Sequence, residues 1–96
     1  MQASSEFSQC IKEYIEEHFP SAEIEQWEHE KNESLNFKIF EQNRTFILRV
    51  MHECLEGIEP QEIKPLLENY NTSQILRDIG DFPIVVTNSG CIFGSP

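Results

Sequence analysis

The segment Thr45–Met51 most constrains what this chain can fold into. It is almost wholly apolar, and Arg49 is its one charged residue. Because successive side chains of a strand point to opposite faces of a sheet, the segment presents apolar groups on both sides. One face would carry Phe46, Leu48 and Val50, and the other Ile47 and Met51. A strand that is apolar on both faces is typical of the centre of a sheet, so we expect a central strand here.

Two further strands are predicted on the N-terminal side of this segment. Leu35, Phe37 and Ile39 alternate with polar residues, and Gln42-Asn43 then forms a two-residue hairpin loop. The range 22–30 is a weaker strand, because Ile24 and Trp27 are three residues apart and break the period of two. A β-bulge near Gln26 would bring both side chains to one face, and we expect one.

Helices are predicted before and after these three strands. The first, over residues 5–19, has one apolar stripe at helical spacing and ends before Pro20: Phe7, Cys10, Ile11, Tyr14, Ile15 and His18. A second follows Gly57 and either kinks or begins at Pro65, with its own stripe of Ile63, Leu66, Leu67 and Tyr70. A third, short helix contains Ile75, Leu76 and Ile79 and ends at Gly80.

The C-terminal segment is rich in strand-forming residues on both sides of a turn. Ile84–Thr87 is followed by Asn88-Ser89-Gly90 and then by Cys91-Ile92-Phe93, which predicts a hairpin or one strand with a tail. The element order is therefore α-β-β-β-α-α-β-(β). This order predicts an α+β fold, a two-layer sandwich with a mainly antiparallel sheet and helices packed on one face. With 96 residues, we expect a single domain over residues 1–96.

The charge balance restricts the classes of partner. Seventeen acidic and seven basic residues give a net charge of −10, and residues 1–33 alone hold nine acidic residues against two basic ones. Proteins bind nucleic-acid phosphates and anionic membrane surfaces with lysine and arginine. We therefore expect neither direct nucleic-acid binding nor membrane binding, and a preference for basic partners.

The cysteines indicate the compartment. Cys10, Cys54 and Cys91 are odd in number and far apart, unlike a disulfide framework. The start MQASSEF lacks the features of a signal peptide, and no apolar run approaches the length of a membrane span. We expect a cytoplasmic protein.

His52-Glu53-Cys54 is the strongest chemical cluster. At a strand end, the side chains of His52 and Cys54 would point the same way, and both are zinc ligands in other proteins. Such a site needs about four ligands, and no second pair at short spacing supplies them. The same pair could act as thiol and base, but Glu53 and Glu56 disfavour the thiolate. We assign no catalytic residue, metal or cofactor, and keep His52 and Cys54 as weak metal candidates.

Two sets of residues are candidates for binding a partner. The first helix has an acidic face that, together with Glu23, Glu25, Glu28 and Glu30, could imitate the charge of a nucleic-acid duplex. Trp27 and Phe40 would mark a contact patch if both were exposed beside one another.

The sequence as a whole predicts a non-enzymatic protein that binds another protein or itself. Sheet edges are templates for pairing, and chains this short often supplement their core by oligomerising, so we expect a homodimer. Two alternatives stay open. One is an acidic mimic that inhibits a basic nucleic-acid-binding protein, and the other is a small metal- or thiol-dependent protein that uses His52 and Cys54.

Overall fold

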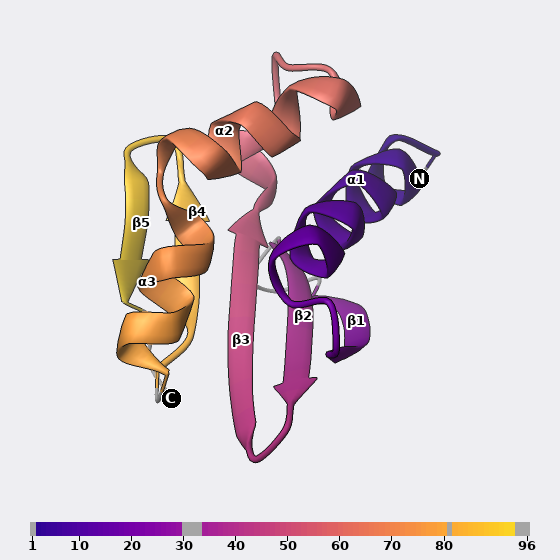
Figure 1. Cartoon of the computed structure of the whole chain (residues 1–96). Helices are drawn as coiled ribbons and strands as arrows, with labels where there is room; N and C mark the ends of the chain where they lie inside the picture. The colour runs from indigo at the N-terminus through magenta and orange to yellow at the C-terminus, as the bar shows by residue number, and fades with distance from the viewer. Residues whose placement is uncertain (1, 30–33, 81, 94–96) are drawn as a thin grey trace.

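The computed structural model describes residues 2–29, 34–80 and 82–93 (Figure 1). The elements follow the chain as α1 (Gln2–His18), β1 (Glu23–His29), β2 (Ser34–Glu41), β3 (Arg44–Met51), the short 3-10 turns η1 (His52–Cys54) and η2 (Pro60–Glu62), α2 (Ile63–Asn69), α3 (Thr72–Ile79), β4 (Ile84–Thr87) and β5 (Gly90–Phe93). The α+β class and the predicted order of elements are confirmed, and the C-terminal segment is a hairpin.

The five strands form one mixed sheet in the order β1-β2-β3-β4-β5. All neighbours are antiparallel except β3 and β4, which are parallel because the chain crosses over through α2 and α3 between them. The helices lie on one face of the sheet (Figure 1). The apolar strand β3 is therefore the central one, as its sequence predicts.

The bulge expected in β1 does not form. Its register with β2 is continuous from Glu23 opposite Phe40 to His29 opposite Ser34. Ile24 therefore faces the helices and Trp27 the opposite side, so the prediction that they share a face is wrong. The physical reason is that β1 is an edge strand. Its polar Gln26 side chain points to the helix face but remains exposed to solvent, so no bulge is needed to remove it from the core.

The start of α2 and the end of α3, at Gly80, have identifiable sequence signals. A capping box at Glu59 and Glu62 leads into α2, where the Glu59 N–H donates to the Glu62 Oε2 at 2.6 Å. Pro65 is the third residue of α2, within the first turn, where no intrahelical N–H partner is needed.

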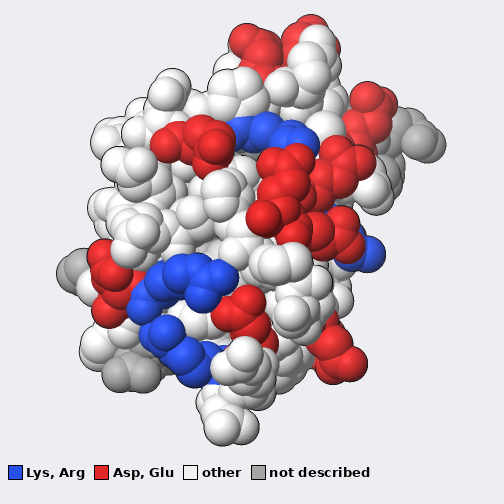
Figure 2. Space-filling view, in the orientation of Figure 1, with Lys and Arg blue, Asp and Glu red and all other residues white. Residues whose placement is uncertain are grey.

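Acidic side chains gather over α1 on the helix face (Figure 2). None of the helices within the described ranges has the length and apolar character required to cross a membrane.

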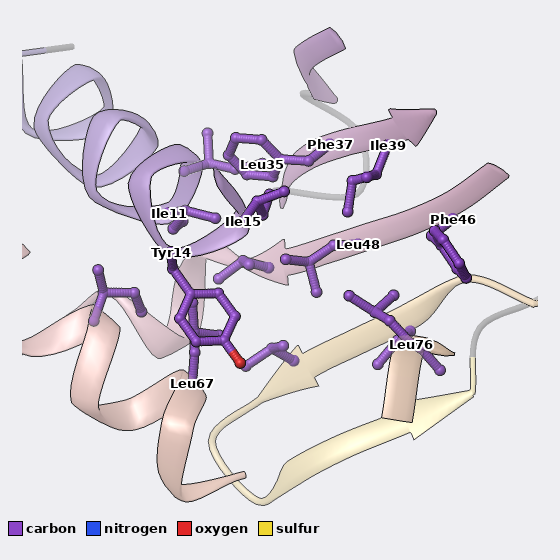
Figure 3. Packing of buried hydrophobic residues seen from close by; sticks show 14 of the residues in the cluster. Ile11, Tyr14, Ile15, Leu35, Phe37, Ile39, Phe46, Leu48, Leu67 and Leu76 are labelled. Carbon is purple, nitrogen blue, oxygen red and sulfur yellow. The ribbon is translucent and has the colours of Figure 1, made fainter. Parts of the chain in front are cut away.

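The core fills the space between the sheet and the helices (Figure 3). Its largest fully buried side chains come from every helix, from the residue after α1 and from β2, β3 and β4: Ile11, Tyr14, Ile15, Phe19, Phe37, Ile39, Phe46, Leu48, Ile63, Leu67, Leu76 and Ile84. Tyr14 also accepts a hydrogen bond at 3.0 Å from the backbone N–H of Ser73, which links α1 to the start of α3. Burial raises the pKa of the Tyr14 hydroxyl.

Arg77 connects α3 to the end of α1 and to the β2–β3 hairpin. It forms an ion pair with Glu41 at 3.0 Å, donates to the His18 carbonyl oxygen at 2.7 Å and stacks over the Phe19 ring. Arg44 donates in turn to the Arg77 carbonyl oxygen at 2.8 Å. Gly80 suits this close approach, because its φ is +73° and a Cβ there would lie 2.8 Å from the Arg44 guanidinium.

Two phenylalanines of β2 give a test of which face is the core. We expect Phe37→Ala to lower the free energy of unfolding by about 3–5 kcal/mol, because it removes a fully buried ring. Phe40→Ala is the matched control on the opposite face, where half-burial predicts a cost of about 1 kcal/mol. Urea denaturation of both variants, monitored by circular dichroism, measures the difference. Equal losses would contradict the assignment of the two faces.

Candidate functional site

The face of the sheet that the helices leave uncovered, here called the open face, is the candidate functional site. Strand register fixes which side chains it carries, because residues directly opposite one another share a face. One row of the open face crosses all five strands and consists of Trp27, Asn36, Arg49, Val85 and Ile92. The five strands thus bring together residues that are up to 65 positions apart in the chain.

The middle of this row is polar and firmly hydrogen-bonded. Arg49 Nε donates to Asn36 Oδ1 at 2.8 Å, and Asn36 Nδ2 donates to Ser34 Oγ at 3.1 Å. Asn36 is only 1% exposed and Ser34 is fully buried. These bonds satisfy polar groups that burial would otherwise penalise, so the centre of the open face is ordered.

Large apolar side chains are exposed at or beside the open face. Among the described residues the exposed ones are Trp27, Phe82 and Ile92, with exposed fractions of 41%, 47% and 53%. Trp27 and Ile92 lie at the two ends of the five-strand row. Phe82 lines a pocket of about 410 Å³ together with Thr45 and Ile47, whose side chains alternate with the core residues of β3.

Trp27 and Phe40 would form one contact patch if they were exposed neighbours, but the structure separates them. Both belong to the open face, but Trp27 is opposite Asn36 and Phe40 is opposite Glu23. Four residues along a strand correspond to about 13 Å, so the two rings do not form a joint patch. Phe40 is half-buried, with the Lys38 ammonium 5.3 Å from its ring centre.

The acidic candidates divide between the two faces. Glu23 and Glu25 are exposed on the open face, and Glu25 lies opposite Lys38. The backbone of Glu28 pairs with Leu35, and Glu30 lies outside the described residues. The exposed acids of α1 belong to a helix that packs on the other face of the sheet: Glu6, Glu13, Glu16 and Glu17. The strand and helix acids therefore do not belong to one flat surface.

His52 and Cys54 do not extend from a strand end, because η1 begins at His52. A 3-10 helix has three residues per turn, so side chains two residues apart diverge by roughly 120°. The expectation that the two side chains point the same way is therefore wrong. The Cys54 thiol is buried and donates to the Val86 carbonyl oxygen at 3.1 Å.

Burial raises the pKa of Cys54 to about 11, with the negative charges of Glu53 and Cys91 as smaller causes. The thiol is protonated at neutral pH, which opposes a nucleophilic role. Within the described ranges, no three His, Cys, Asp or Glu side chains are grouped in a way that could hold a metal ion.

The sequence does not predict Phe82, Ile92 or the Arg49–Asn36 hydrogen bond as features of the site. The alternation in the β4–β5 hairpin places Ile92 on the face of Val85, a signal present in the sequence. That this face is the open one follows only from the parallel pairing of β3 with β4, which no local pattern reveals.

Comparison with known proteins does not assign the chain to a family. No family model matches it, and no curated protein or solved structure matches it either.

The raised pKa of Cys54 predicts low thiol reactivity in the folded protein. With a pKa of about 11 in place of 9.0, the thiolate fraction at pH 8 falls roughly 100-fold. We expect Cys54 to be alkylated by iodoacetamide at least that much more slowly in the folded protein than in 6 M guanidinium chloride. Peptide mass spectrometry of a time course measures both rates, and comparable rates would contradict the buried, protonated thiol.

Proposed function

We propose that the protein binds another protein through the open face of its sheet, without catalysing a reaction. The observation that carries the proposal is that Trp27, Phe82 and Ile92, large apolar side chains exposed to water, lie on or beside the face without helices. Tryptophan is enriched among the residues that anchor protein interfaces, so Trp27 is the strongest contact candidate of the three. The hydrogen-bonded centre at Asn36 and Arg49 supports the proposal, because it provides a rigid platform.

The chemistry around Trp27 suggests the kind of partner. The exposed carboxylates of Glu23 and Glu25 lie on the same face of the same edge strand as Trp27. We therefore propose a partner with an apolar side chain flanked by lysine or arginine, which the net charge of −10 also favours. Direct nucleic-acid and membrane contacts are not part of the proposal. The free cysteines Cys10, Cys54 and Cys91 support a reducing, cytoplasmic location.

We also propose that the protein forms a homodimer. The support is that both edge strands, β1 and β5, have one side without a partner strand in the described sheet, and such edges are templates for pairing. A chain of 96 residues also gains stability from burying more apolar surface on association.

An acidic mimic of a nucleic-acid duplex is the second candidate function. The gathering of exposed acids over α1 favours it (Figure 2). Glu17 is paired with Lys64 there, which weakens the contiguous negative field that such a mimic needs. The two functions differ in the surface used, so variants on opposite faces distinguish them.

Trp27 gives the main test, because it is the only tryptophan of the chain. We expect Trp27→Ala to weaken binding of a partner captured by the wild-type protein by roughly 30-fold or more, as for buried aromatic anchors at interfaces. With that purified partner, wild-type tryptophan emission should shift to shorter wavelength as Trp27 loses water contact. Isothermal titration calorimetry and fluorescence measure the two effects.

Glu13→Lys is the control on the helix face. Under the main proposal it leaves the affinity unchanged and the complex survives high salt. Loss of binding in Glu13→Lys, together with full binding by Trp27→Ala and release at high salt, would instead support the acidic mimic.

A further inference from the structure

The two edges of the sheet differ in a way that selects one of them for pairing. The seven residues of β1 include Glu23, Glu25 and Glu28, and charges on an edge strand oppose pairing with another strand. The four residues of β5 carry no charge, and neither does any residue in the range 82–93. Because residues 1–33 hold most of the negative charge, two copies approach with the least repulsion at β5, on the far edge of the sheet from β1.

The backbone of β5 is arranged for pairing with an identical strand. Thr87 and Gly90 flank a two-residue turn, which closes on a hydrogen-bonded pair. Alternate residues then direct their N–H and C=O groups to opposite sides, so those of Cys91 and Phe93 point away from β4. In an antiparallel pair centred on Ile92, Cys91 of each copy would exchange two hydrogen bonds with Phe93 of the other.

We propose that two copies of this chain associate by antiparallel pairing of β5 with β5, with the two-fold axis at Ile92. The inference rests on the proposed homodimer and names its surface. Ile92 would face Ile92 of the second copy in a non-hydrogen-bonded pair, where side chains are closest. Each exposed Ile92 would thereby be covered, beside Val85 of its own chain, and the two sheets would become one ten-stranded sheet.

The pairing predicts specific disulfide trapping. Residues in a non-hydrogen-bonded pair have Cα atoms about 4.5 Å apart, within the range of a disulfide. We expect Ile92→Cys to form a covalent dimer rapidly when oxidised by diamide, detected by non-reducing gel electrophoresis. The wild-type protein, whose Cys91 faces the other side of the sheet, and Trp27→Cys, on the same face at the opposite edge, are the controls and should not form it at that rate.

Sedimentation velocity tests the association without a cross-link. Because β5 is short, we expect a dimer that dissociates on dilution, and Ile92→Lys should raise its dissociation constant at least about 10-fold through like charges at the axis. Trp27→Lys introduces the same positive charge at the other edge of the sheet and should leave the dimer intact. Circular dichroism checks that both variants fold.

The outcomes separate the interface from the homodimer itself. A wild-type monomer at all concentrations would overturn both proposals. A wild-type dimer that neither Ile92→Lys weakens nor Ile92→Cys traps would overturn the β5 interface alone. Trapping at Ile92 without trapping at Trp27 supports it.

Discussion

The packing of α1 on one face of the β2–β3 pair is the contact on which the rest of the structure depends. Ile11 and Ile15 of α1 point toward Phe37 and Leu48 of the sheet in one cluster of fully buried side chains (Figure 3). Burial of these side chains contributes about 1.5–3 kcal/mol each, more than any surface interaction in the molecule. Since strand side chains alternate, this contact also determines which residues face away from the helices, and therefore the composition of the open face.

The crossover from β3 to β4 adds the strands β4 and β5 to the sheet and so widens both of its faces. Both crossover helices return on the side of α1, and Arg77 of α3 is held by Glu41 and by the His18 carbonyl oxygen. With the helices on one side, the parallel pairing of β3 with β4 places Val85 on the open face, and the β4–β5 pairing places Ile92 beside it. The exposed ends of that face are thus a consequence of where the core is, and not of local sequence.

The sequence suffices for the elements and fails where neighbours in space decide the outcome. Apolar periodicity predicts the helices and the central strand β3, because each pattern reflects burial within one element, whereas it leaves the C-terminal segment as either a hairpin or one strand with a tail. It wrongly places Trp27 on the same face as Ile24. On an edge strand the polar Gln26 can stay exposed on the helix face, so the bulge that would bring Ile24 and Trp27 together does not form. It also fails at Cys54, where a 3-10 turn replaces the end of a strand, and at Ile92, whose face depends on strand pairing far along the chain.

The open face has a polar centre, unlike the apolar face that packs against the helices. At this centre, Arg49 Nε donates a hydrogen bond to the buried Asn36 Oδ1. Two of the exposed apolar side chains lie on the edge strands, where Trp27 has carboxylates beside it and Ile92 has none, and the third, Phe82, lies beside the central strand β3. Charge next to an apolar group selects partners of opposite charge, whereas an uncharged edge accepts a copy of itself. Under the two proposals, one sheet would present two separate recognition surfaces, and the carboxylates that would attract a basic partner at Trp27 would also oppose self-association at that edge.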